Sequence, residues 1–316
     1  MAKVSLTARY RPQTFSQVVG QDYIKSILSR AAAEDKIAPA YLFSGTRGVG
    51  KTTIARILAK AINCEHGPAP EPCNRCAHCV QITKGAATDV MEIDGASHTG
   101  VDNVRKLREE VAYAPLSCRY KVVIIDEAHM LSKSAFNALL KTLEEPPKHC
   151  VFIMATTEPE KFPITIISRC QHYVFKRIPQ NELISHLQSV LEAEKVDYEP
   201  QALALIARRG AGSVRDSMSL LAQVLALGEK KFTAKDVRNV LGLAGQEFFF
   251  QAIEAIYNQD LVSLNHIVQD LQNQGLDLGF FLREFAMCWR NLFLLARAGQ
   301  QAKKIIELPE EELDAW

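Results

Sequence analysis

Short apolar runs alternate with amphipathic stretches along the first 178 residues of the chain. Four consecutive β-branched residues, Val122 to Ile125, are typical of a strand that is buried on both faces. Because such strands alternate with helical stretches, the pattern predicts an α/β fold, with a mainly parallel sheet covered by helices. The predicted strands are Tyr41–Phe43, Asp89–Ile93, Lys121–Ile125, Val151–Ala155 and His172–Phe175.

One predicted helix between these strands is marked at both ends. Ser132 is a residue type that caps helix N-termini, and Pro146 and Pro147 prevent a helix from continuing. Between them, apolar residues recur at helical spacing, at Phe136, Leu139, Leu140 and Leu143.

The pattern changes after Ile178-Pro179, where strand-like runs give way to helical ones. A third region, also helical, begins near Gly245 and is rich in Phe and Trp. These aromatic residues predict either a helix core or a subunit interface, and the sequence leaves both open. Helices of the middle region are predicted at about 180–195, 200–209, 213–227 and 233–241.

The composition of the chain excludes some classes of protein. Its 316 residues are 47% hydrophobic and 23% charged, as in an ordinary globular protein. No apolar run approaches the length that spans a membrane, and Met1–Leu6 does not resemble a signal peptide. The 37 Lys and Arg residues balance 36 Asp and Glu, so binding to nucleic acid through overall charge is not expected, whereas local basic faces stay open.

A phosphate-binding motif, Gly-x4-Gly-Lys-Thr, follows the first predicted strand and opens a helical pattern, which is the context that gives the motif weight. Glycines let the loop turn its N–H groups toward phosphate oxygens. Lys51 adds a positive charge, and Thr52 offers a hydroxyl ligand to Mg²⁺. We therefore expect a nucleotide to bind at Gly45, Thr46, Arg47, Gly48, Val49, Gly50, Lys51 and Thr52.

Two carboxylates follow the buried run that ends at Ile125. They emerge at the C-terminal end of the predicted strand, where parallel α/β sheets bind ligands. Asp126 is expected to hold Mg²⁺, and Glu127 to orient and deprotonate an attacking water. Together with the phosphate-binding motif, this pair predicts nucleotide hydrolysis.

Other polar positions are ambiguous on residue type alone. Thr156 and Thr157 follow the fourth predicted strand, where they either reach a phosphate or act as ordinary strand-end caps. Arg169, in Ser-Arg-Cys, and Arg215, in Gly-Ser-Val-Arg-Asp, are by composition ordinary surface cations.

Four cysteines follow the phosphate-binding helix with the spacing Cys-x8-Cys-x2-Cys-x2-Cys. Thiolates bind Zn²⁺ tetrahedrally, and Cys-x2-Cys steps bring neighbouring sulfurs to one ion. His66 and His78 are not expected as ligands, because four cysteines fill the coordination shell. Paired disulfides are the alternative, which the absence of a signal peptide disfavours. We expect structural zinc at Cys64, Cys73, Cys76 and Cys79.

These segments together resemble the AAA+ ATPases, and within them the gamma/tau family of clamp-loader subunits of bacterial DNA polymerase III. The resemblance is dense over about two thirds of the chain, and the cysteine insert and the Ser-Arg-Cys motif are its most specific parts. Besides the motifs described above, it includes Arg9–Pro12, Val19–Gln21, Phe136–Pro147, Ala155–Thr157 and Ser168–Cys170.

The resemblance implies an AAA+ P-loop parallel sheet with a zinc-binding insert in residues 1–178, a helical lid domain in 179–243 and part of a helical collar domain in 244–316. It assigns catalytic roles to Lys51 and Glu127. It implies that Thr157 senses the γ-phosphate, that Arg215 senses phosphate from the lid, and that Arg169 is an arginine finger for the ATP of a neighbouring subunit. The residues that it places around the adenine are Arg11, Pro12 and Val19.

The resemblance also implies a motor of the replicative clamp loader, which is cytoplasmic and works within the DNA polymerase III holoenzyme with ATP, Mg²⁺ and Zn²⁺. ATP binding would open a ring-shaped sliding clamp, and primed DNA would trigger hydrolysis. The implied partners are delta-type and delta-prime-type subunits, further copies of the chain, the clamp and the phosphates of primed DNA, with no membrane. Arg105 and Lys141 occupy positions where basic residues of the family face DNA, although each is as readily a solvated helix charge.

Three other classes of function compete with this interpretation. Intact Lys51, Thr52, Asp126 and Glu127 argue against a non-hydrolysing structural subunit of the same machine. The cysteine insert and the Ser-Arg-Cys motif argue against another AAA+ motor, such as a branch-migration helicase. The helical regions argue against a small-molecule kinase. Since the family has a longer third domain, and the chain stops within a helical pattern at Glu311–Trp316, a C-terminally truncated form without tau-specific contacts is expected.

Overall fold

The computed structural model describes residues 5–97, 100–228, 231–299, 301 and 306. The chain divides into two compact units, and each is described by itself. The first unit contains residues 1–194 and 210–222, and the second contains 195–209 and 223–316. The predicted chain end at Glu311–Trp316 lies outside the described residues. Within the described ranges, no helix combines the length and the apolar character needed to cross a membrane.

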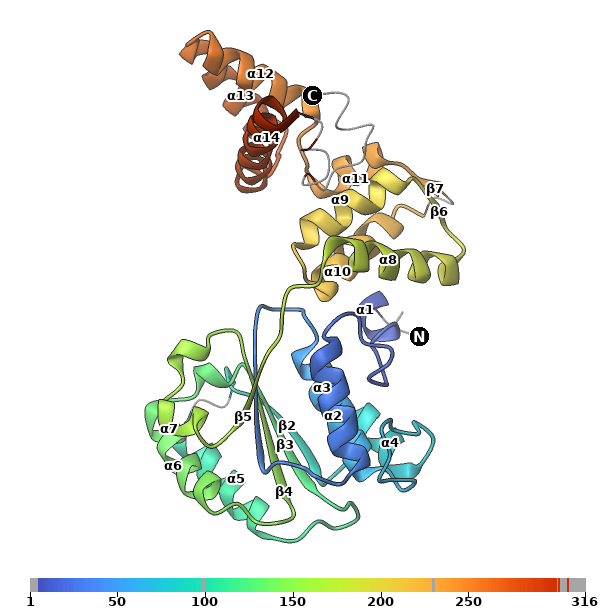
Figure 1. Cartoon of the computed structure of the whole chain (residues 1–316), viewed down its shortest axis with the longest axis vertical. Coiled ribbons are helices and arrows are strands. Elements are labelled where there is room, and N and C mark those ends of the chain that lie inside the picture. The colour runs from blue at the N-terminus through green and yellow to red at the C-terminus, as the bar shows by residue number, and fades with distance from the viewer. Residues whose placement is uncertain (1–4, 98–99, 229–230, 300, 302–305, 307–316) are drawn as a thin grey trace. The chain divides into compact units, whose positions relative to one another are not determined.

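The first unit is built on a five-stranded parallel sheet with the strand order β2-β3-β4-β1-β5 (Figure 1). All five predicted strands are confirmed, and their bounds differ from the expected ones by at most one residue. The apolar runs form the central strands, which are buried, and the more polar runs form the edges. The strands are β1 (Ala40–Ser44), β2 (Val90–Asp94), β3 (Lys121–Asp126), β4 (Cys150–Thr156) and β5 (Gln171–Val174).

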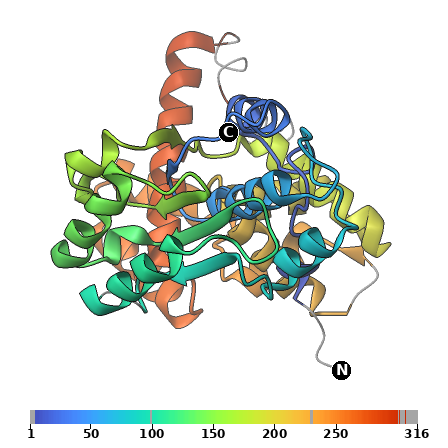
Figure 2. The same cartoon turned by 90° about the horizontal axis from the view of Figure 1, so that it is seen from below.

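Side chains that alternate along β1 serve two different cores. Tyr41 and Phe43 pack in a cluster with residues of α2 (Asp22–Ala33) and α3 (Lys51–Asn63). Leu42 packs on the opposite face of the sheet, with residues of the helices that follow β2, β3 and β4. Figures 1 and 2 show these two groups of helices on either side of the sheet. The second group is α5 (Val101–Ala112), α6 (Lys133–Glu144) and α7 (Ile164–Ile167).

The predicted ends of α6 are confirmed. The Ser132 hydroxyl accepts a hydrogen bond from the Ala135 N–H at 3.2 Å, and the helix ends at Glu144, just before the two prolines. Two 3₁₀ turns, Ala128–Met130 and Pro159–Lys161, follow β3 and β4. The remaining helices of this unit are α1 (Leu6–Arg9), α4 (Ala77–Lys84), α8 (Gln180–Glu194) and the start of α10 (Val214–Leu225).

The second unit is helical, but it also contains a short strand pair. β6 (Asp197–Tyr198) and β7 (Lys231–Phe232) pair in parallel, so the expectation that strands end after Pro179 is wrong. Two-residue strands are too short to leave a period-2 pattern, which is why the sequence does not reveal them. The helices are α9 (Pro200–Gly210), α11 (Ala234–Leu241), α12 (Gln246–Tyr257), α13 (Leu261–Asn273) and α14 (Leu278–Ala298).

Some aromatic residues of the second unit pack in a core, and others are exposed. The rings of Phe249, Phe281 and Phe285 stack with centroid distances of 5.0, 6.3 and 5.7 Å, which confirms a helix core for these three. Phe293 is 62% exposed on α14. A subunit interface stays a prediction for Phe293.

A buried carboxylate fixes the loop that leads into β3. Asp89 is 1% exposed, and its side chain accepts hydrogen bonds from the backbone N–H groups of Leu116, Ser117 and Cys118 at 2.8, 2.8 and 2.9 Å. Burial alone raises the pKa of Asp89, but these donors together outweigh it and lower the pKa below its usual value. The ionised form therefore stabilises the folded unit.

We expect Asp89→Asn to lower the free energy of unfolding by about 1–3 kcal/mol near neutral pH. The side-chain amide of asparagine would place its own N–H donors against the backbone N–H groups that the carboxylate accepts from. The folded-state pKa is depressed, so the stabilisation is present above the unfolded pKa and is lost as pH falls through the folded one. Urea unfolding should thus show the difference from wild type shrinking below about pH 4. The control is Asp102→Asn, at a carboxylate that is 82% exposed. If the unfolding free energy of Asp89→Asn differed from that of wild type by the same amount at every pH, the prediction would be contradicted.

Candidate functional site

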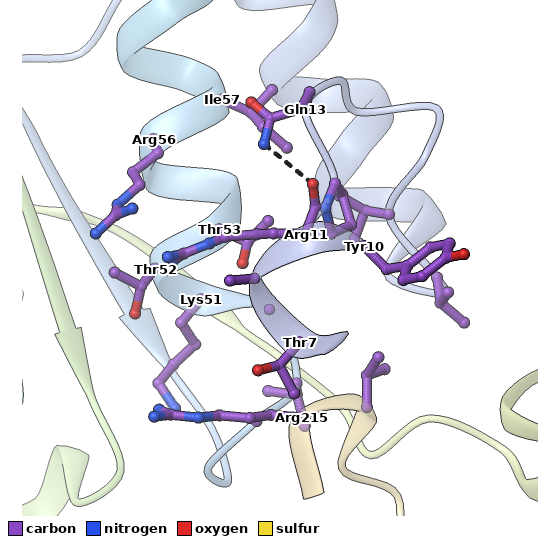
Figure 3. Close-up of a pocket in the computed structure, with 18 of the residues that line it drawn as sticks. Thr7, Tyr10, Arg11, Gln13, Lys51, Thr52, Thr53, Arg56, Ile57 and Arg215 are labelled. Carbon is purple, nitrogen blue, oxygen red and sulfur yellow. Dashed lines mark hydrogen bonds between the residues drawn. The ribbon is translucent and has the colours of Figure 1, made fainter. Parts of the chain in front are cut away.

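A cavity of about 590 Å³ lies in the first unit beside the phosphate-binding motif (Figure 3). It brings together residues that are far apart in the sequence, from the segment before α2, the start of α3, the end of β3 and the start of α10. Gly45, Thr46, Thr157 and Arg169 do not line it. The predicted nucleotide residues in its wall are Arg11, Pro12, Val19, Arg47, Gly48, Val49, Gly50, Lys51, Thr52, Asp126, Glu127 and Arg215.

Glycine is required in the phosphate-binding loop for conformation and for space. Gly48 and Gly50 have φ values of +77° and +102°, in the left-handed region that favours glycine. A Cβ atom on Gly48 would collide with the Ser213 hydroxyl. The Gly48 carbonyl accepts a hydrogen bond from the Arg215 N–H at 3.3 Å, and this close approach brings the start of α10 to the loop.

Lys51 is folded back onto the phosphate-binding loop. Its side chain is buried, and Nζ donates to the carbonyls of Gly45 and Thr46 at 2.7 and 2.8 Å. Burial lowers the pKa of Lys51, and the carboxylates of Glu127 and Asp126 oppose that shift. Lys51 and Arg215 both line the cavity (Figure 3). The two cations give this part of the cavity the charge that phosphate groups require.

The two predicted Mg²⁺ ligands lie in contact. The Thr52 hydroxyl donates to Asp126 Oδ2 at 2.9 Å, and Asp126 Oδ1 accepts from the Glu127 N–H at 3.0 Å. A hydroxyl and a carboxylate are the hard oxygen ligands that Mg²⁺ prefers. The donor set therefore fits this ion, with Thr52 and Asp126 as the residues that would hold it.

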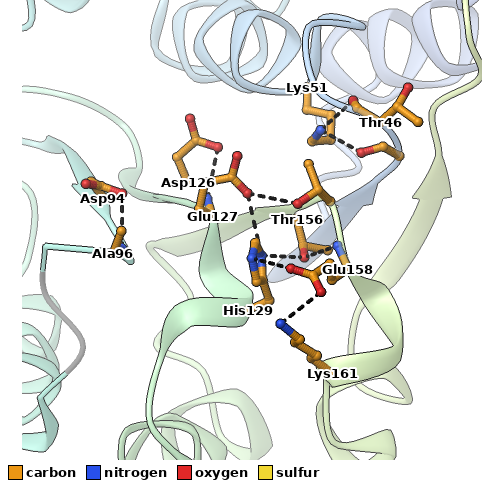
Figure 4. A network of polar contacts seen from close by, with 12 residues as sticks. Thr46, Lys51, Asp94, Ala96, Asp126, Glu127, His129, Thr156, Glu158 and Lys161 are labelled. Carbon is orange, nitrogen blue, oxygen red and sulfur yellow. Dashed lines mark hydrogen bonds and ion pairs between the residues drawn. The ribbon is translucent and has the colours of Figure 1, made fainter. Parts of the chain in front are cut away.

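Glu127 belongs to a polar network at the ends of β3 and β4 (Figure 4). The Thr157 hydroxyl donates to Glu127 Oε2 at 3.3 Å, and His129 Nδ1 lies 3.5 Å from the same oxygen. His129 is nearly buried, with Nδ1 3.1 Å from the Thr156 hydroxyl and Nε2 3.0 Å from Glu158 Oε1. These contacts fix the carboxylate of Glu127 at the edge of the cavity.

Sequence reasoning missed the part that His129 plays. The residue lies two positions after Glu127, so its place in the motif was visible, but its contacts depend on β3 pairing with β4. Arg56 and Glu92 were also missed. They form a two-point ion pair at 2.6 and 2.5 Å in the wall of the cavity. Arg56 lies on α3 and Glu92 on β2, so their contact depends on the packing of this helix against this strand, which no local sequence pattern predicts.

Arg169 and the predicted DNA residues lie elsewhere on the first unit. Arg169 donates to the Thr165 carbonyl at 2.6 Å and pairs with Glu144 at 2.9 Å. Arg105, on α5, is exposed and pairs with Asp102. Lys141 is exposed on α6, which packs beside α5. The roles of Arg169, Arg105 and Lys141 stay predictions.

The cysteine insert forms a compact cluster. Ligand atoms of Cys64, Cys73, Cys76 and His66 all lie within 4.8 Å of one another. Cys79 is not in that group, although its side chain is buried against the same cysteines. The structure thus brings together three of the four predicted zinc ligands with a histidine that was not expected, and Cys79 stays a predicted ligand.

Backbone hydrogen bonds in the insert favour the thiolate form of Cys73, whereas burial raises the pKa of Cys64 and Cys79. The N–H groups of Arg75 and Cys76 donate to Cys73 Sγ, and the Cys79 N–H donates to Cys76 Sγ. The Arg75 N–H is the main reason that the pKa of Cys73 is lowered to about 6. Clustered sulfurs with a thiolate at neutral pH fit a zinc ion. His78 is engaged elsewhere, with Nδ1 2.9 Å from the Asn63 carbonyl.

Three family models match consecutive parts of the chain. Residues 20–179 match the DNA polymerase III delta subunit. Residues 182–230 match the ATPase lid domain of the DNA polymerase III clamp loader subunit, and residues 232–316 match domain III of DNA polymerase III subunits gamma and tau.

Curated relatives agree with these matches. DNA polymerase III subunit tau of Bacillus subtilis is 43% identical over 298 residues, which cover 94% of this chain and 53% of the relative. DNA polymerase III subunit gamma of Buchnera aphidicola subsp. Baizongia pistaciae is 43% identical over 259 residues, which cover 82% of this chain and 70% of the relative. The Escherichia coli tau subunit is also 43% identical, and the chain covers 42% of it. The chain spans about half the length of the tau relatives.

Solved structures support the fold. The RuvB Holliday junction branch migration motor of Thermotoga maritima superposes with a TM-score of 0.56 and 20% identity, covering 85% of this chain and 86% of that one. At this identity the likeness shows the fold alone.

We expect Cys79→Ser to reduce bound zinc well below about one ion per chain and His66→Ala to retain it, because four thiolates complete a tetrahedral shell. Cys79 is buried in the cluster, whereas His66 is exposed. Zinc content is measured on the purified chain, with Cys73→Ser as the positive control for loss. Retention in Cys79→Ser together with loss in His66→Ala would make His66 the fourth ligand.

Proposed function

Because the chain belongs to the gamma/tau family of bacterial DNA polymerase III clamp-loader subunits, we propose that it is an ATP-hydrolysing motor subunit of the replicative clamp loader. ATP binding and hydrolysis open a sliding clamp and load it onto primed DNA. The observation that carries this proposal is the cavity in which Lys51, Thr52, Asp126 and Glu127 lie together.

ATP binding starts at the loop between β1 and α3. The backbone N–H groups of the loop and the N-terminus of α3 attract the phosphate oxygens. Lys51 exchanges the carbonyls of Gly45 and Thr46 for the β- and γ-phosphates, and Arg215 adds a second cation from α10. The adenine lies against the segment that carries Arg11, Pro12 and Val19.

Hydrolysis depends on the carboxylate of Glu127. It accepts a proton from the attacking water, while Thr157 and His129 hold it in place. We propose that Thr157 also senses the γ-phosphate, as the family resemblance implies. Mg²⁺, held by Thr52 and Asp126, neutralises charge on the phosphates when it is bound.

The proposed assembly contains delta-type and delta-prime-type subunits, further copies of the chain, a sliding clamp and primed DNA, in the bacterial cytoplasm. Arg169 is proposed to act on the ATP of a neighbouring subunit, as the family resemblance implies, and it does not line the cavity of its own chain. Arg105 and Lys141 are the proposed contacts to DNA phosphates. Zinc has a structural role. The rival branch-migration motor rests on a likeness of fold alone.

We expect Glu127→Gln to bind ATP with nearly unchanged affinity but to hydrolyse it about 10²–10⁴-fold more slowly, since an amide cannot accept the proton of the water. Turnover is measured with the partner subunits, with and without clamp and primed DNA, and stimulation by clamp and DNA together identifies a clamp-loading motor. Lys51→Ala is the comparison for the binding step and should lose ATP affinity. Undiminished turnover by Glu127→Gln would remove it as the base, and ATP binding without stimulation would argue against clamp loading.

We expect Arg169→Ala to leave the nucleotide affinity of the isolated chain unchanged and to reduce DNA-stimulated turnover of the assembled complex by about 10³–10⁵-fold, the range measured for arginine fingers. The matched control is Arg30→Ala, which removes an exposed arginine that pairs with Glu34 and should lower the rate of neither the isolated chain nor the complex. An equal loss of turnover by Arg169→Ala in the isolated chain would show that Arg169 acts within its own subunit.

A further inference from the structure

One wall of the nucleotide cavity is a segment without regular structure. Residues 11–20, between α1 and α2, belong to no helix or strand, yet several of them line the cavity. Buried backbone groups outside helices and sheets need hydrogen-bond partners from turns, side chains or water. The position of this wall therefore depends on the contacts that residues 11–20 make with neighbouring elements. Its lining residues are Arg11, Pro12, Gln13, Val18 and Val19.

The cysteine insert supplies a carboxylate to this wall. Glu71 lies two residues before Cys73, and its two oxygens accept from the backbone N–H groups of Phe15 and Ser16 at 2.7 and 2.8 Å. Phe15 is 2% exposed and packs in the core beneath the sheet. A carboxylate that accepts two backbone N–H groups holds them with charge-assisted hydrogen bonds, which are about twice as strong as neutral ones.

A buried lysine makes the second connection. Lys60, on α3, is 2% exposed, and its Nζ donates to the Gln13 carbonyl at 2.9 Å and to Gln13 Oε1 at 2.7 Å. The third donor goes to Asn74 Oδ1 at 2.7 Å. An ammonium has three donors, so all of them are used. Asn74 lies between Cys73 and Cys76 in the insert, so the same cation joins the insert to the wall.

We propose that the cysteine insert braces the nucleotide pocket through Glu71, Asn74 and Lys60, so that zinc at the cysteines and nucleotide in the cavity strengthen each other's binding. This inference rests on the proposed function. The chain between Cys64 and Cys73 is rich in Pro and Gly and contains no helix or strand. A metal bound at the cysteines would therefore limit the movement of Glu71, which precedes Cys73, and of Asn74, which follows it. A wall that is already positioned costs less to order when nucleotide binds. The coupling is reciprocal, because binding free energies of two ligands are linked.

The test compares the affinity of the zinc-loaded chain for a fluorescent ATP analogue with Mg²⁺ in wild type, Glu71→Gln and Asn74→Ala. Neither Glu71 nor Asn74 lines the cavity, so a change in affinity cannot come from a lost contact with the nucleotide. Lys60 lines it and is left unchanged for that reason. The matched control is Glu65→Gln, in the same insert, whose half-exposed carboxylate lies beside His78.

We expect Glu71→Gln and Asn74→Ala each to bind the nucleotide at least about fivefold more weakly than wild type, which is the lower end of ordinary coupling between two sites. Glu65→Gln should bind it as wild type does. Zinc affinity, measured by competition with a chelator, should rise by the same factor when nucleotide is added to the wild type, and less in the variants. Equal nucleotide affinities in all four zinc-loaded chains would overturn the brace and leave the proposed function standing. A wild type that binds no nucleotide would instead overturn the proposed function.

Discussion

The parallel pairing of the central strands decides where the polar residues of the first unit meet. β1 pairs with β4 so that Ser44 lies opposite Thr156, and β2 pairs with β3 so that Asp94 lies opposite Asp126. Parallel strands end at one edge of the sheet, so residues from distant parts of the chain converge there. The 2.9 Å contact between Thr52 and Asp126 joins residues 74 positions apart and exists only because of this register.

Buried charges depend on the same framework, and each is matched with specific partners. Lys51 and Lys60 donate to oxygens of the loops beside α3, and Asp89 accepts from the loop before β3. Desolvation offsets part of the electrostatic gain from each of these pairings. Leaving one of them unpaired is costly, however, so each fixes the position of the loop that supplies its partners. In this unit, buried charge serves to place loops around the cavity.

Structural features that depend on the local sequence pattern could be predicted from the sequence. The five strands, the capped helix after Ser132 and the glycines of the phosphate-binding loop follow from periodicity, capping and conformational preference. His129 and the brace at Glu71 could not be predicted, because their partners lie on other elements and no spacing along the chain encodes them. The place of His66 in the cysteine cluster could not be predicted for a different reason. Four cysteines already complete a tetrahedral zinc site, so the sequence gives no reason to expect a histidine there.

Arg169 is more exposed than the buried lysines of the first unit. Its guanidinium is held by Glu144 and by the Thr165 carbonyl, and about a third of the side chain is exposed. A partly exposed ion pair of this kind contributes about 0–1 kcal/mol, so its exchange for another anion costs little. Lys51, by contrast, is buried and held by two carbonyls beside its own phosphate site. The difference in burial is compatible with the two proposed roles, Lys51 for a phosphate within the chain and Arg169 for one that a neighbouring molecule presents.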